Sequence, residues 1–391
     1  MNSPINRNID IVCFSLSRWN AEISSPAVAL AKEFAKTNRV FFIEHPFSFK
    51  DILFRSDKKF KPRQQADPNN KLSPIIVTPK PVLPINFLPP GKLYDQLHRV
   101  NNGKMVRELR QLIRRHRIVE YVFINFFDPF FFDEIPEDIK PLKYIYQCMD
   151  DMSQVKYTSR HGVRLENRII SKAHLVLCTS TRLVELKRKY SNAVYLHPNA
   201  ADFRLFNSAA TASYPRPAEM EFGGKKIIGF TGSIEYRTDF DLLKKIALEH
   251  PDKVLFLLGP VSGTEHLTAR LDKIENIVFA GSRELSQLPR YLQHMDCCII
   301  PYKQNTLTAS IYPLKINEYL FAGKPVISTA FSKDIAAFAD VAYIARSSHD
   351  FISLITTALN EDDATRKAAR IKVAAENTWE KRVEEFWQLL T

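Results

Sequence analysis

The stretch from Tyr312 to Ser328, YPLKINEYLFAGKPVIS, decides the fold of this 391-residue chain. A helix can begin at Pro313, because the missing N–H of a proline would be unpaired there anyway. Gly323 marks the end of that helix, and the apolar run Pro325–Ser328 predicts a buried strand. The backbone amides of such a helix start attract phosphate, and Glu318, one turn in, can accept hydrogen bonds from a vicinal diol such as a ribose. The same residues also fit a helix without a binding role that begins at a proline and ends at a glycine.

The segments around this stretch alternate between strand-like and helix-like patterns. Such alternation predicts an α/β protein whose parallel sheets are covered by helices on both faces. We expect two Rossmann-like, doubly wound domains that face each other across a cleft. The expected parts are a first domain at 1–206 with a basic insert at 48–92, a linker at 207–224, a second domain at 225–374 and a C-terminal helix at 375–391 packing back toward the first domain.

Composition excludes several classes of protein. The chain is 45% hydrophobic and 25% charged, which is typical of a folded domain and not of a disordered or collagen-like chain. No apolar run reaches the roughly 18 residues of a membrane span, and no signal peptide precedes the first strand-like segment. The five cysteines lie in apolar segments without zinc-ligand spacing. We therefore expect a cytoplasmic protein with no metal site.

Positive charge is concentrated in the first half of the chain. Residues 1–222 contain 34 Lys and Arg against 22 Asp and Glu, whereas residues 223–391 contain 21 of each. Residues 51–117 alone contain 15 basic and 5 acidic residues. Such a patch predicts an anionic partner, either a phospholipid surface or a nucleic acid, although a solvated basic face without a partner also fits. Aromatic residues alternate with lysines over 47–61, which favours peripheral docking on the inner face of the cytoplasmic membrane.

A second motif precedes the first by about 80 residues. The apolar run Ile227–Thr231 predicts a strand, and Gly232 after it allows the backbone to approach a ligand closely. This motif is neither a dinucleotide fingerprint nor a P-loop.

Taken in order, the motifs resemble a known family. They are PNAAD at 198–202, GFTGS at 229–233 and PLKINEYLFAGKPV at 313–326. This set is similar to the retaining glycosyltransferases of the GT-B fold, in the large family four, and best to its bacterial surface-polysaccharide branch of the teichuronic-acid and capsule type. The resemblance implies retaining transfer of a hexose from a UDP- or GDP-linked sugar to a lipid-linked or polysaccharide acceptor. It implies neither a metal nor a resident cofactor, and no nucleic-acid partner.

The resemblance also implies roles for individual residues in the second half. Glu318 would bind the ribose hydroxyls, the Gly232–Ser233 loop would approach the donor diphosphate, and Leu314 would give an amide to a phosphate. Lys315 and Arg237 would neutralise phosphate charge. Ser310 stands where the family has a glutamate that contacts the transferred sugar, so the identity of the sugar is open.

In the first half, the expected acceptor side is less typical of the family. Met149 and Asp150 stand where the family has a His-Asp pair, so only the aspartate is kept. Asp150 and Asp151 would orient the acceptor or the transferred sugar, or would cap the helix after the strand. Arg18 would meet a phosphate and Trp19 would stack on a sugar, or both would simply pack.

Three other functions stay open at this point. They are a nucleotide-sugar epimerase on the same fold, a catalytically silent relative acting as a scaffold, and a nucleic-acid-binding protein. The absence of carboxylates and histidines at Met149 and Ser310 argues against the epimerase.

Overall fold

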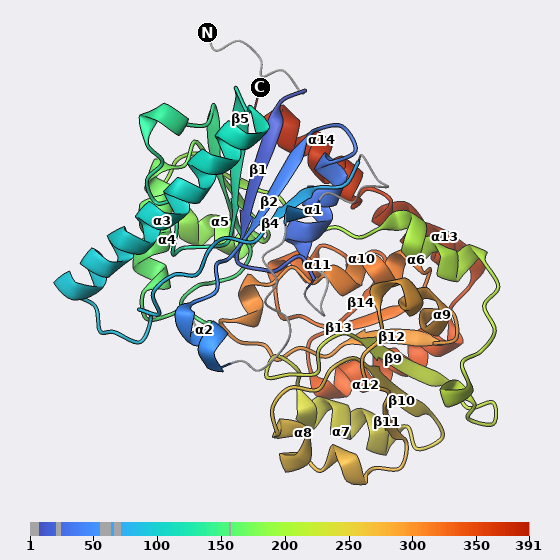
Figure 1. The fold of residues 1–391 in the computed structure, drawn as a ribbon. Helices are drawn as coiled ribbons and strands as arrows, with labels where there is room; N and C mark the ends of the chain where they lie inside the picture. Colours follow the sequence, from blue (N-terminus) through green and yellow to red (C-terminus); the bar gives the residue numbers. More distant parts are fainter. Residues whose placement is uncertain (1–7, 21–24, 55–63, 66–71, 156–157, 391) are drawn as a thin grey trace. The chain divides into compact units, whose positions relative to one another are not determined.

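The computed structural model describes residues 8–20, 25–54, 64–65, 72–155 and 158–390, and its chain divides into two compact units (Figure 1). The first unit contains residues up to Pro198 together with Arg382–Thr391, and the second contains Asn199–Lys381. The first unit thus ends before the boundary at 206 that the sequence favoured. In the described part of the chain, no helix combines the length and apolar character needed to cross a bilayer.

The first unit is built on an eight-stranded sheet of order β3-β4-β2-β1-β5-β6-β7-β8. Every neighbouring pair is parallel except β3 and β4, which are antiparallel. Long apolar runs form the central strands because both of their faces are buried. The strands are β1 Asp10–Ser15, β2 Val40–Glu44, β3 Gln64–Gln65, β4 Ile75–Val77, β5 Tyr121–Phe126, β6 Lys143–Cys148, β7 Leu175–Cys178 and β8 Val194–Leu196.

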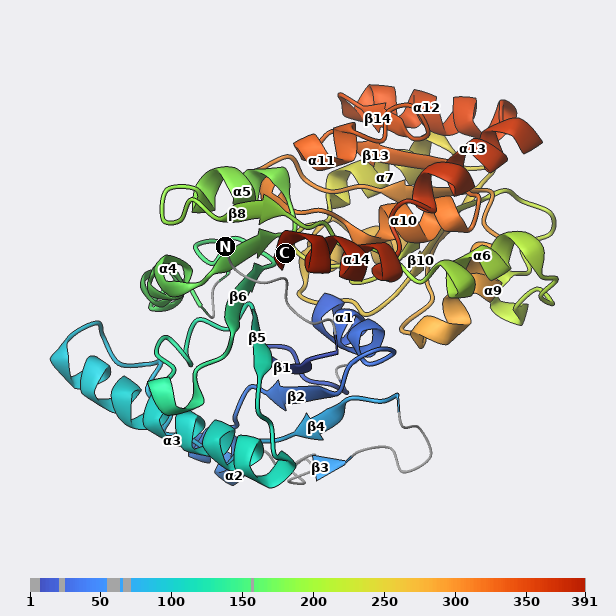
Figure 2. The ribbon, with the colours of Figure 1, turned by 90° about the horizontal axis from the view of Figure 1, so that it is seen from above.

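Helices cover both faces of this sheet. α1 and α3 lie on opposite sides of it (Figure 2). α1 begins after Ser25, whose side chain accepts a hydrogen bond from the amide of Ala27. On the α1 side, Phe34 packs edge-to-face on Phe386 from the end of the chain, with ring centres 4.8 Å apart. The helices are α1 Pro26–Phe34, α2 Phe49–Phe54, α3 Lys92–His116, α4 Gly162–Lys172, α5 Thr181–Lys187 and the last part of α14 Trp379–Leu390.

The second unit has a six-stranded, fully parallel sheet of order β11-β10-β9-β12-β13-β14. The order runs outward in both directions from β9, which is the doubly wound arrangement of dinucleotide-binding folds. The strands are β9 Ile227–Thr231, β10 Val254–Leu258, β11 Ile277–Phe279, β12 Cys297–Ile300, β13 Val326–Thr329 and β14 Tyr343–Ala345. The predicted α/β class, with two parallel-sheet units, is therefore confirmed.

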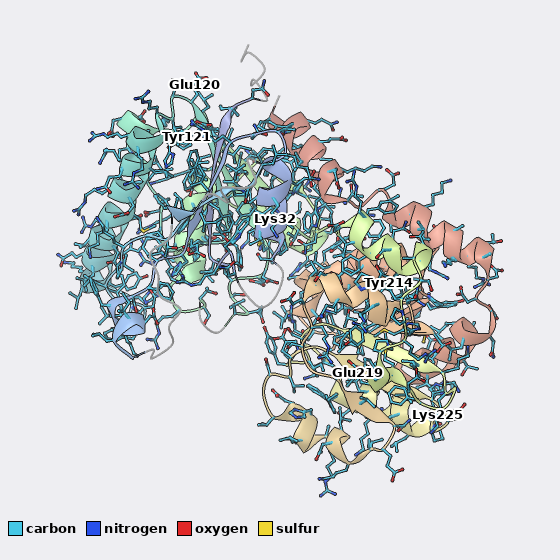
Figure 3. The ribbon with its side chains drawn as sticks, turned by 45° about the vertical axis from the view of Figure 1, so that its right-hand side comes forward. Lys32, Glu120, Tyr121, Tyr214, Glu219 and Lys225 are labelled. Atoms are coloured by element: carbon cyan, nitrogen blue, oxygen red, sulfur yellow. The ribbon has the colours of Figure 1, made fainter. Side chains whose placement is uncertain are left out.

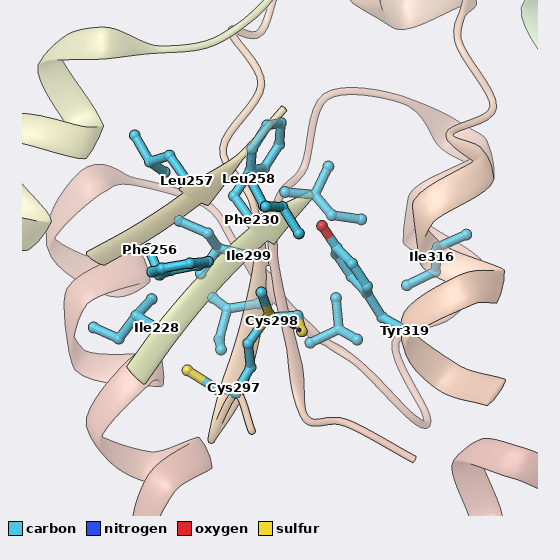
Figure 4. Close-up of a cluster of buried hydrophobic side chains, with 14 of the residues drawn as sticks. Ile228, Phe230, Phe256, Leu257, Leu258, Cys297, Cys298, Ile299, Ile316 and Tyr319 are labelled. Atoms are coloured by element: carbon cyan, nitrogen blue, oxygen red, sulfur yellow. Dashed lines mark hydrogen bonds between the residues drawn. The ribbon is translucent and has the colours of Figure 1, made fainter. Parts of the chain in front are cut away.

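The core of the second unit is formed where α10 packs on the central strands. Tyr319 of α10 points at the strands and lies beside Ile316, Phe230 and Cys298 (Figure 4). Cys297 and Cys298 are buried thiols of this core, and burial raises their pKa. The helices are α6 Phe203–Thr211, α7 Phe240–Glu249, α8 Glu265–Thr268, α9 Leu288–Leu292, α10 Leu314–Phe321, α11 Lys333–Ala336, α12 Ser348–Asn360 and α13 Ala364–Ala374.

Three segments differ from the sequence-based expectation. The basic insert at 48–92 contains α2 and β4, and β4 extends the first sheet through its pairing with β2. Residues 55–63 and 66–71 lie outside the described residues. The C-terminal helix expected at 375–391 begins only at Trp379, because Ala201 forms a parallel bridge with Thr378 and its N–H donates to the Asn377 carbonyl.

The segment 207–224, expected as a linker, lies inside the second unit rather than between units. Its first residues complete α6, and its remainder is tied down by polar contacts. The Tyr214 amide donates to the Gln293 side chain, and Glu219 accepts from Tyr291 and Arg283 at 2.6 and 2.9 Å. Tyr214 and Glu219 can be located in Figure 3. The small residues and prolines of 207–224 therefore belong to a segment that packs on the surface of the second unit.

Candidate functional site

The carboxyl ends of β9 and β12 meet at the point where the strand order of the second sheet reverses. Open parallel sheets bind ligands at such a point. β9 ends in Thr231, followed by Gly232 and Ser233, and β12 is followed by Pro301 and Tyr302. This edge of the second unit is the candidate functional site.

Glycine is required at two places on this edge. Gly232 has a φ of +109°, in a region that side-chain-bearing residues rarely adopt. Gly259, directly after β10, has a φ of +157°, and a Cβ there would stand 2.1 Å from the Gly232 carbonyl oxygen. The two loops therefore approach each other backbone to backbone. The result is a rim of main chain that has no side chains of its own at these two positions.

The start of α10 is held against this rim. The hydroxyl of Tyr319 accepts a hydrogen bond from the Thr231 amide at 2.8 Å, which ties the helix to the end of β9. Pro313 is the N-cap residue and supplies no side-chain acceptor to the first amides of the helix. Asn199 donates to the Tyr312 carbonyl at 3.0 Å and fixes the turn before the helix. The amide end of α10, with its partial positive charge, is thus fixed at the rim.

Lys315 brings a full positive charge to the same place. A Cβ on Gly232 would lie only 2.7 Å from the Lys315 Nζ, so the ammonium group stands directly over the glycine backbone. The Nζ donates to the Tyr302 hydroxyl at 3.0 Å and lies 5.1 Å from the centre of the Phe230 ring. These contacts hold a long, flexible side chain in one position.

Arg237 lies on the far side of Tyr302. Its guanidinium carbon is 6.0 Å from the centre of the Tyr302 ring, and it forms an ion pair with Glu235. Tyr302 therefore contacts both cations that the sequence predicted. Because Glu235 neutralises part of its charge, Arg237 contributes less free positive charge than Lys315.

Glu318 lies one turn into α10, half-buried, with no hydrogen bond to its carboxylate from the described residues. Burial raises its pKa to about 7, and the charge of Lys315 opposes the shift. A half-buried carboxylate without protein donors can accept hydrogen bonds from a ligand. Leu314, Lys315 and Glu318 all lie on α10, as the sequence predicted.

The two predicted serines have different positions. Ser233 follows Gly232 at the rim and is half-buried. Ser310 is buried in a short 3₁₀ turn, Thr308–Ser310, which leads into α10. Ser310 is therefore close to α10 in sequence, and its side chain is buried inside the second unit.

In the first unit, Asp150 and Asp151 follow β6. The Asp151 carboxylate accepts hydrogen bonds from the Ser153 amide and hydroxyl at 3.0 and 2.7 Å. It is therefore part of a local turn and caps no helix, since the next helix, α4, begins only at Gly162. Asp150 is half-buried, and its carbonyl oxygen accepts from the Cys148 thiol at 3.6 Å.

Arg18 and Trp19 follow β1 and are engaged within the first unit. The Arg18 guanidinium lies 3.4 Å from the centre of the Phe47 ring and donates to the His45 carbonyl at 3.1 Å. Trp19 packs edge-to-face on Phe42, and its amide donates to Glu44 at 3.0 Å. These contacts match the packing alternative for both residues.

Sequence reasoning missed three features of these two edges. Tyr302 and Gly259 each follow a predicted strand, so their position after an apolar run was the available signal. His45 follows β2 and pairs with Asp128, which follows β5, at 2.5 Å between Nδ1 and Oδ2. Among the described residues, no group of three or more His, Cys, Asp or Glu side chains could hold a metal ion.

The two sheets and their strand orders define the fold as GT-B. Along 98% of both chains the structure is similar to sucrose-phosphate synthase of Thermosynechococcus elongatus, with a TM-score of 0.69 and 15% identity. It is also similar to Anabaena HepE in complex with UDP and glucose, with a TM-score of 0.62 and 12% identity over 96% of this chain and 99% of that one. These identities show the fold alone.

Sequence comparison adds information on the second unit. Residues 225–361 match the family model of glycosyl transferases group 1, so most of this unit is similar to domains of that kind. The chain is also 28% identical over 225 residues to TuaH of Bacillus subtilis (strain 168), whose name assigns it provisionally as a glycosyltransferase of teichuronic acid biosynthesis. That match spans 55% of this chain and 56% of TuaH, little more than half the length of each.

Proposed function

We propose that this protein is a glycosyltransferase that moves a hexose from a nucleoside-diphosphate sugar to a lipid-linked or polysaccharide acceptor. The observation that carries the proposal is the position of Lys315 over the bare backbone of Gly232, at the uncapped start of α10. The family match over 225–361 covers both residues and supports the same assignment.

The diphosphate of the donor would lie at this rim. The amides of Ser233 and Leu314 and the ammonium of Lys315 would surround it, with Arg237 further out; the Gly232 amide donates to the Leu258 carbonyl. When the bond between the sugar and the diphosphate breaks, negative charge develops on the leaving phosphate. Fixed amides and cations stabilise such charge most when they need no rearrangement, and the contacts of Lys315 with Tyr302 and Phe230 provide that.

The ribose of the donor would lie one turn along α10. Glu318 has carboxylate oxygens without donors, and the two hydroxyls of a ribose would supply them. Uridine or guanosine is the expected base, in keeping with the HepE structure, which contains UDP. Ser310 would border the transferred sugar. We also propose that the transfer retains the anomeric configuration of the sugar. Lys315 and Arg237 would stabilise the leaving diphosphate without a metal ion.

The acceptor side of the proposal rests on the first unit. Asp150, at the carboxyl end of β6, would orient the acceptor or the transferred sugar, while Asp151 shapes the turn beside it. Arg18 and Trp19 would border the acceptor from the loop after β1.

Peripheral membrane binding through the first unit is a further part of the proposal. Phe49 and Leu53 of α2, and Phe87 and Leu93 before and within α3, are exposed apolar side chains. α2 lies beside α3, where the Lys104 Nζ is 4.9 Å from the centre of the Phe49 ring (Figures 1 and 2). α3 also contains Arg107, Arg110, Arg114 and Arg115, of which Arg110 forms an ion pair with Asp138. Apolar groups among basic ones fit the surface of an anionic bilayer.

A donor panel tests the function. The protein is incubated with UDP-, GDP-, ADP- and dTDP-hexoses and octyl β-glucoside, and release of nucleoside diphosphate and glycosylated product is measured. We expect turnover with one donor and its loss in Glu318→Ala, while Glu275→Ala, an exposed carboxylate elsewhere in the same unit, keeps it. Epimerised donor without transfer would favour the epimerase. No turnover with any donor would favour the scaffold.

A further inference from the structure

Tyr302, which follows β12, is fixed by contacts with the segments on both sides of that strand in the second sheet. It forms an isolated antiparallel bridge with Thr238, which lies between β9 and α7. Its carbonyl oxygen accepts a hydrogen bond from the hydroxyl of Thr329, the last residue of β13, at 2.6 Å. The centre of its ring lies 5.2 Å from that of Phe331. The side chain is therefore held in place without any ligand.

The contact with Lys315 decides where the Tyr302 hydroxyl can donate. An ammonium group can only donate, so the phenol oxygen is the acceptor in the 3.0 Å contact with Nζ. The phenol hydrogen therefore points away from Nζ, and no group among the described residues accepts it. Tyr302 is only 4% exposed, so this hydrogen is on a buried side chain. A hydroxyl that accepts from a cation is polarised, which strengthens it as a donor.

The Tyr302 hydroxyl lies at the rim where the diphosphate of the donor is proposed to bind. Its partner, the Lys315 Nζ, is 2.7 Å from the position of a Cβ on Gly232. The Gly232 amide itself cannot serve a ligand there, because it donates to the Leu258 carbonyl at 2.8 Å. A diphosphate has many acceptor oxygens and needs several donors. A hydroxyl that is one hydrogen bond away from the ammonium can donate to the same anion.

The surroundings of this hydroxyl suit an anion. The Lys315 Nζ lies 5.5 Å and the Arg237 guanidinium carbon 6.0 Å from the centre of the Tyr302 ring. Thr238 is opposite Tyr302 in the bridge, and the side chains of directly opposed residues point to the same face. The Thr238 hydroxyl is also buried and, within the described part of the chain, has no hydrogen-bond partner. Two buried hydroxyls with hydrogens to donate, next to two cations, fit a ligand with negative charge and many acceptor oxygens.

We propose that the Tyr302 hydroxyl donates a hydrogen bond to the diphosphate of the sugar donor, beside the Lys315 ammonium. This inference rests on the proposed function, and it gives Tyr302 a contact with the substrate in addition to its contact with the lysine. The proton stays on the phenol oxygen throughout. As the sugar leaves, negative charge grows on the diphosphate, and a donor that is already fixed in place stabilises that charge.

The test separates a direct hydrogen bond from an effect that passes only through Lys315. Tyr302→Phe keeps the ring but lacks the hydroxyl, and it is made both in wild type and in Lys315→Met. Affinities for UDP, GDP, ADP and dTDP and for the matching nucleoside are measured by ligand-observed NMR at millimolar ligand, which detects weak binding. Tyr343→Phe is the matched control, because the Tyr343 hydroxyl accepts from Arg366 at 2.8 Å and Tyr343 begins β14, away from the carboxyl ends of the strands.

We expect Tyr302→Phe to weaken binding of the matching nucleoside diphosphate about tenfold, and to weaken it further in Lys315→Met, while the nucleoside binds as before. Tyr343→Phe should bind both ligands as wild type does. The proposal is overturned if Tyr302→Phe stays within twofold of wild type, if its effect disappears in Lys315→Met, or if affinity for the nucleoside falls equally. If wild type binds none of the four nucleotides, the proposed function itself fails, and that outcome is distinct.

Discussion

The ammonium group of Lys315 lies over the backbone of Gly232, at 2.7 Å from the position a Cβ would occupy. The two residues come from different elements, α10 and the loop after β9, and Tyr302 from a third segment holds the lysine in place. A cation above exposed main chain is what a diphosphate requires, because both the charge and the amides are then within its reach.

Gly232→Ala is expected to abolish nucleotide binding and to destabilise the protein. Alanine at a φ of +109° costs about 1–2 kcal/mol in backbone strain, and its methyl group would displace Lys315. Thermal denaturation with and without nucleotide measures both effects. The control is Gly103→Ala within α3, where a Cβ meets nothing within 4 Å and should be neutral or slightly stabilising. If both variants had the same stability and the same response to nucleotide, the proposed nucleotide site at Gly232 would be contradicted.

Lys315→Met separates charge from packing. Methionine keeps the apolar contacts with Phe230 and Tyr302 but lacks the ammonium group. We expect affinity for a nucleoside diphosphate to fall about tenfold or more, a loss of about 1.5–3 kcal/mol for a charged hydrogen bond, while the free nucleoside binds as before. Calorimetric titration with both ligands checks this. Lys303→Met, a lysine 5.9 Å from the Phe240 ring, should leave both affinities unchanged.

Glu318 makes stability depend on pH in an unusual direction. Its pKa is raised to about 7 in the folded state from an ordinary value of 4.5, so the folded protein favours the protonated form. Its ionisation therefore costs stability as pH rises from about 4.5 to 7, by at most about 3 kcal/mol above pH 7. Glu318→Gln should be more stable than wild type at pH 8, with a smaller difference at pH 5. Urea denaturation at the two pH values measures this, and an equal difference at both would count against it.

The first unit contains a buried ion pair whose rupture should be costly. Lys187 Nζ lies 2.6 Å from Glu166 Oε2, and Tyr146 donates to the other carboxylate oxygen at 3.0 Å. Lys187→Met leaves the carboxylate buried without its cation, which costs about 3–5 kcal/mol. The matched control, Lys140→Met, breaks an exposed pair with Glu137 and should cost less than about 1 kcal/mol. Similar losses of unfolding free energy in both variants would show that the buried pair contributes no more to stability than the exposed pair.

If the first unit docks on a membrane through α2, a charged residue on that helix should weaken membrane binding. Leu53 is 78% exposed, and Leu53→Asp should weaken binding to vesicles that contain phosphatidylserine by about tenfold or more. Leu248→Asp, on the exposed side of α7 in the second unit, should not change it. Vesicle sedimentation with phosphatidylcholine alone as the neutral surface completes the comparison. If all variants bound equally to vesicles with and without phosphatidylserine, membrane docking through the first unit would be contradicted.

Most of the fold could be predicted from the sequence because its strands are continuous apolar runs. α10 begins and ends where Pro313 and Gly323 indicated, and β13 lies within one residue of the predicted strand Pro325–Ser328. β4 was missed because its three residues stand among prolines and become a strand only through pairing with β2. α6 extends into the expected linker because Ala209 is buried in the core of the second unit.

The candidate site could be predicted only where it is local in sequence. Leu314, Lys315 and Glu318 share one helix, so their spacing indicated a common role. The contacts of Lys315 with Gly232 and Tyr302, and of His45 with Asp128, join segments far apart in the chain. They depend on the order of the strands in each sheet, which no local pattern contains. The contacts of Arg18 with His45 and Phe47 have the same origin, whereas the turn that Asp151 forms with Ser153 is local in sequence.

The most direct test of the central claim is thermal stabilisation by UDP, GDP, ADP and dTDP, measured on wild type and Glu318→Ala. We predict that one nucleotide raises the melting temperature of wild type and that the variant loses this response, because the ribose loses its carboxylate partner. A flat response of wild type to all four nucleotides would contradict a nucleotide-sugar site on α10, and with it the proposed glycosyl transfer.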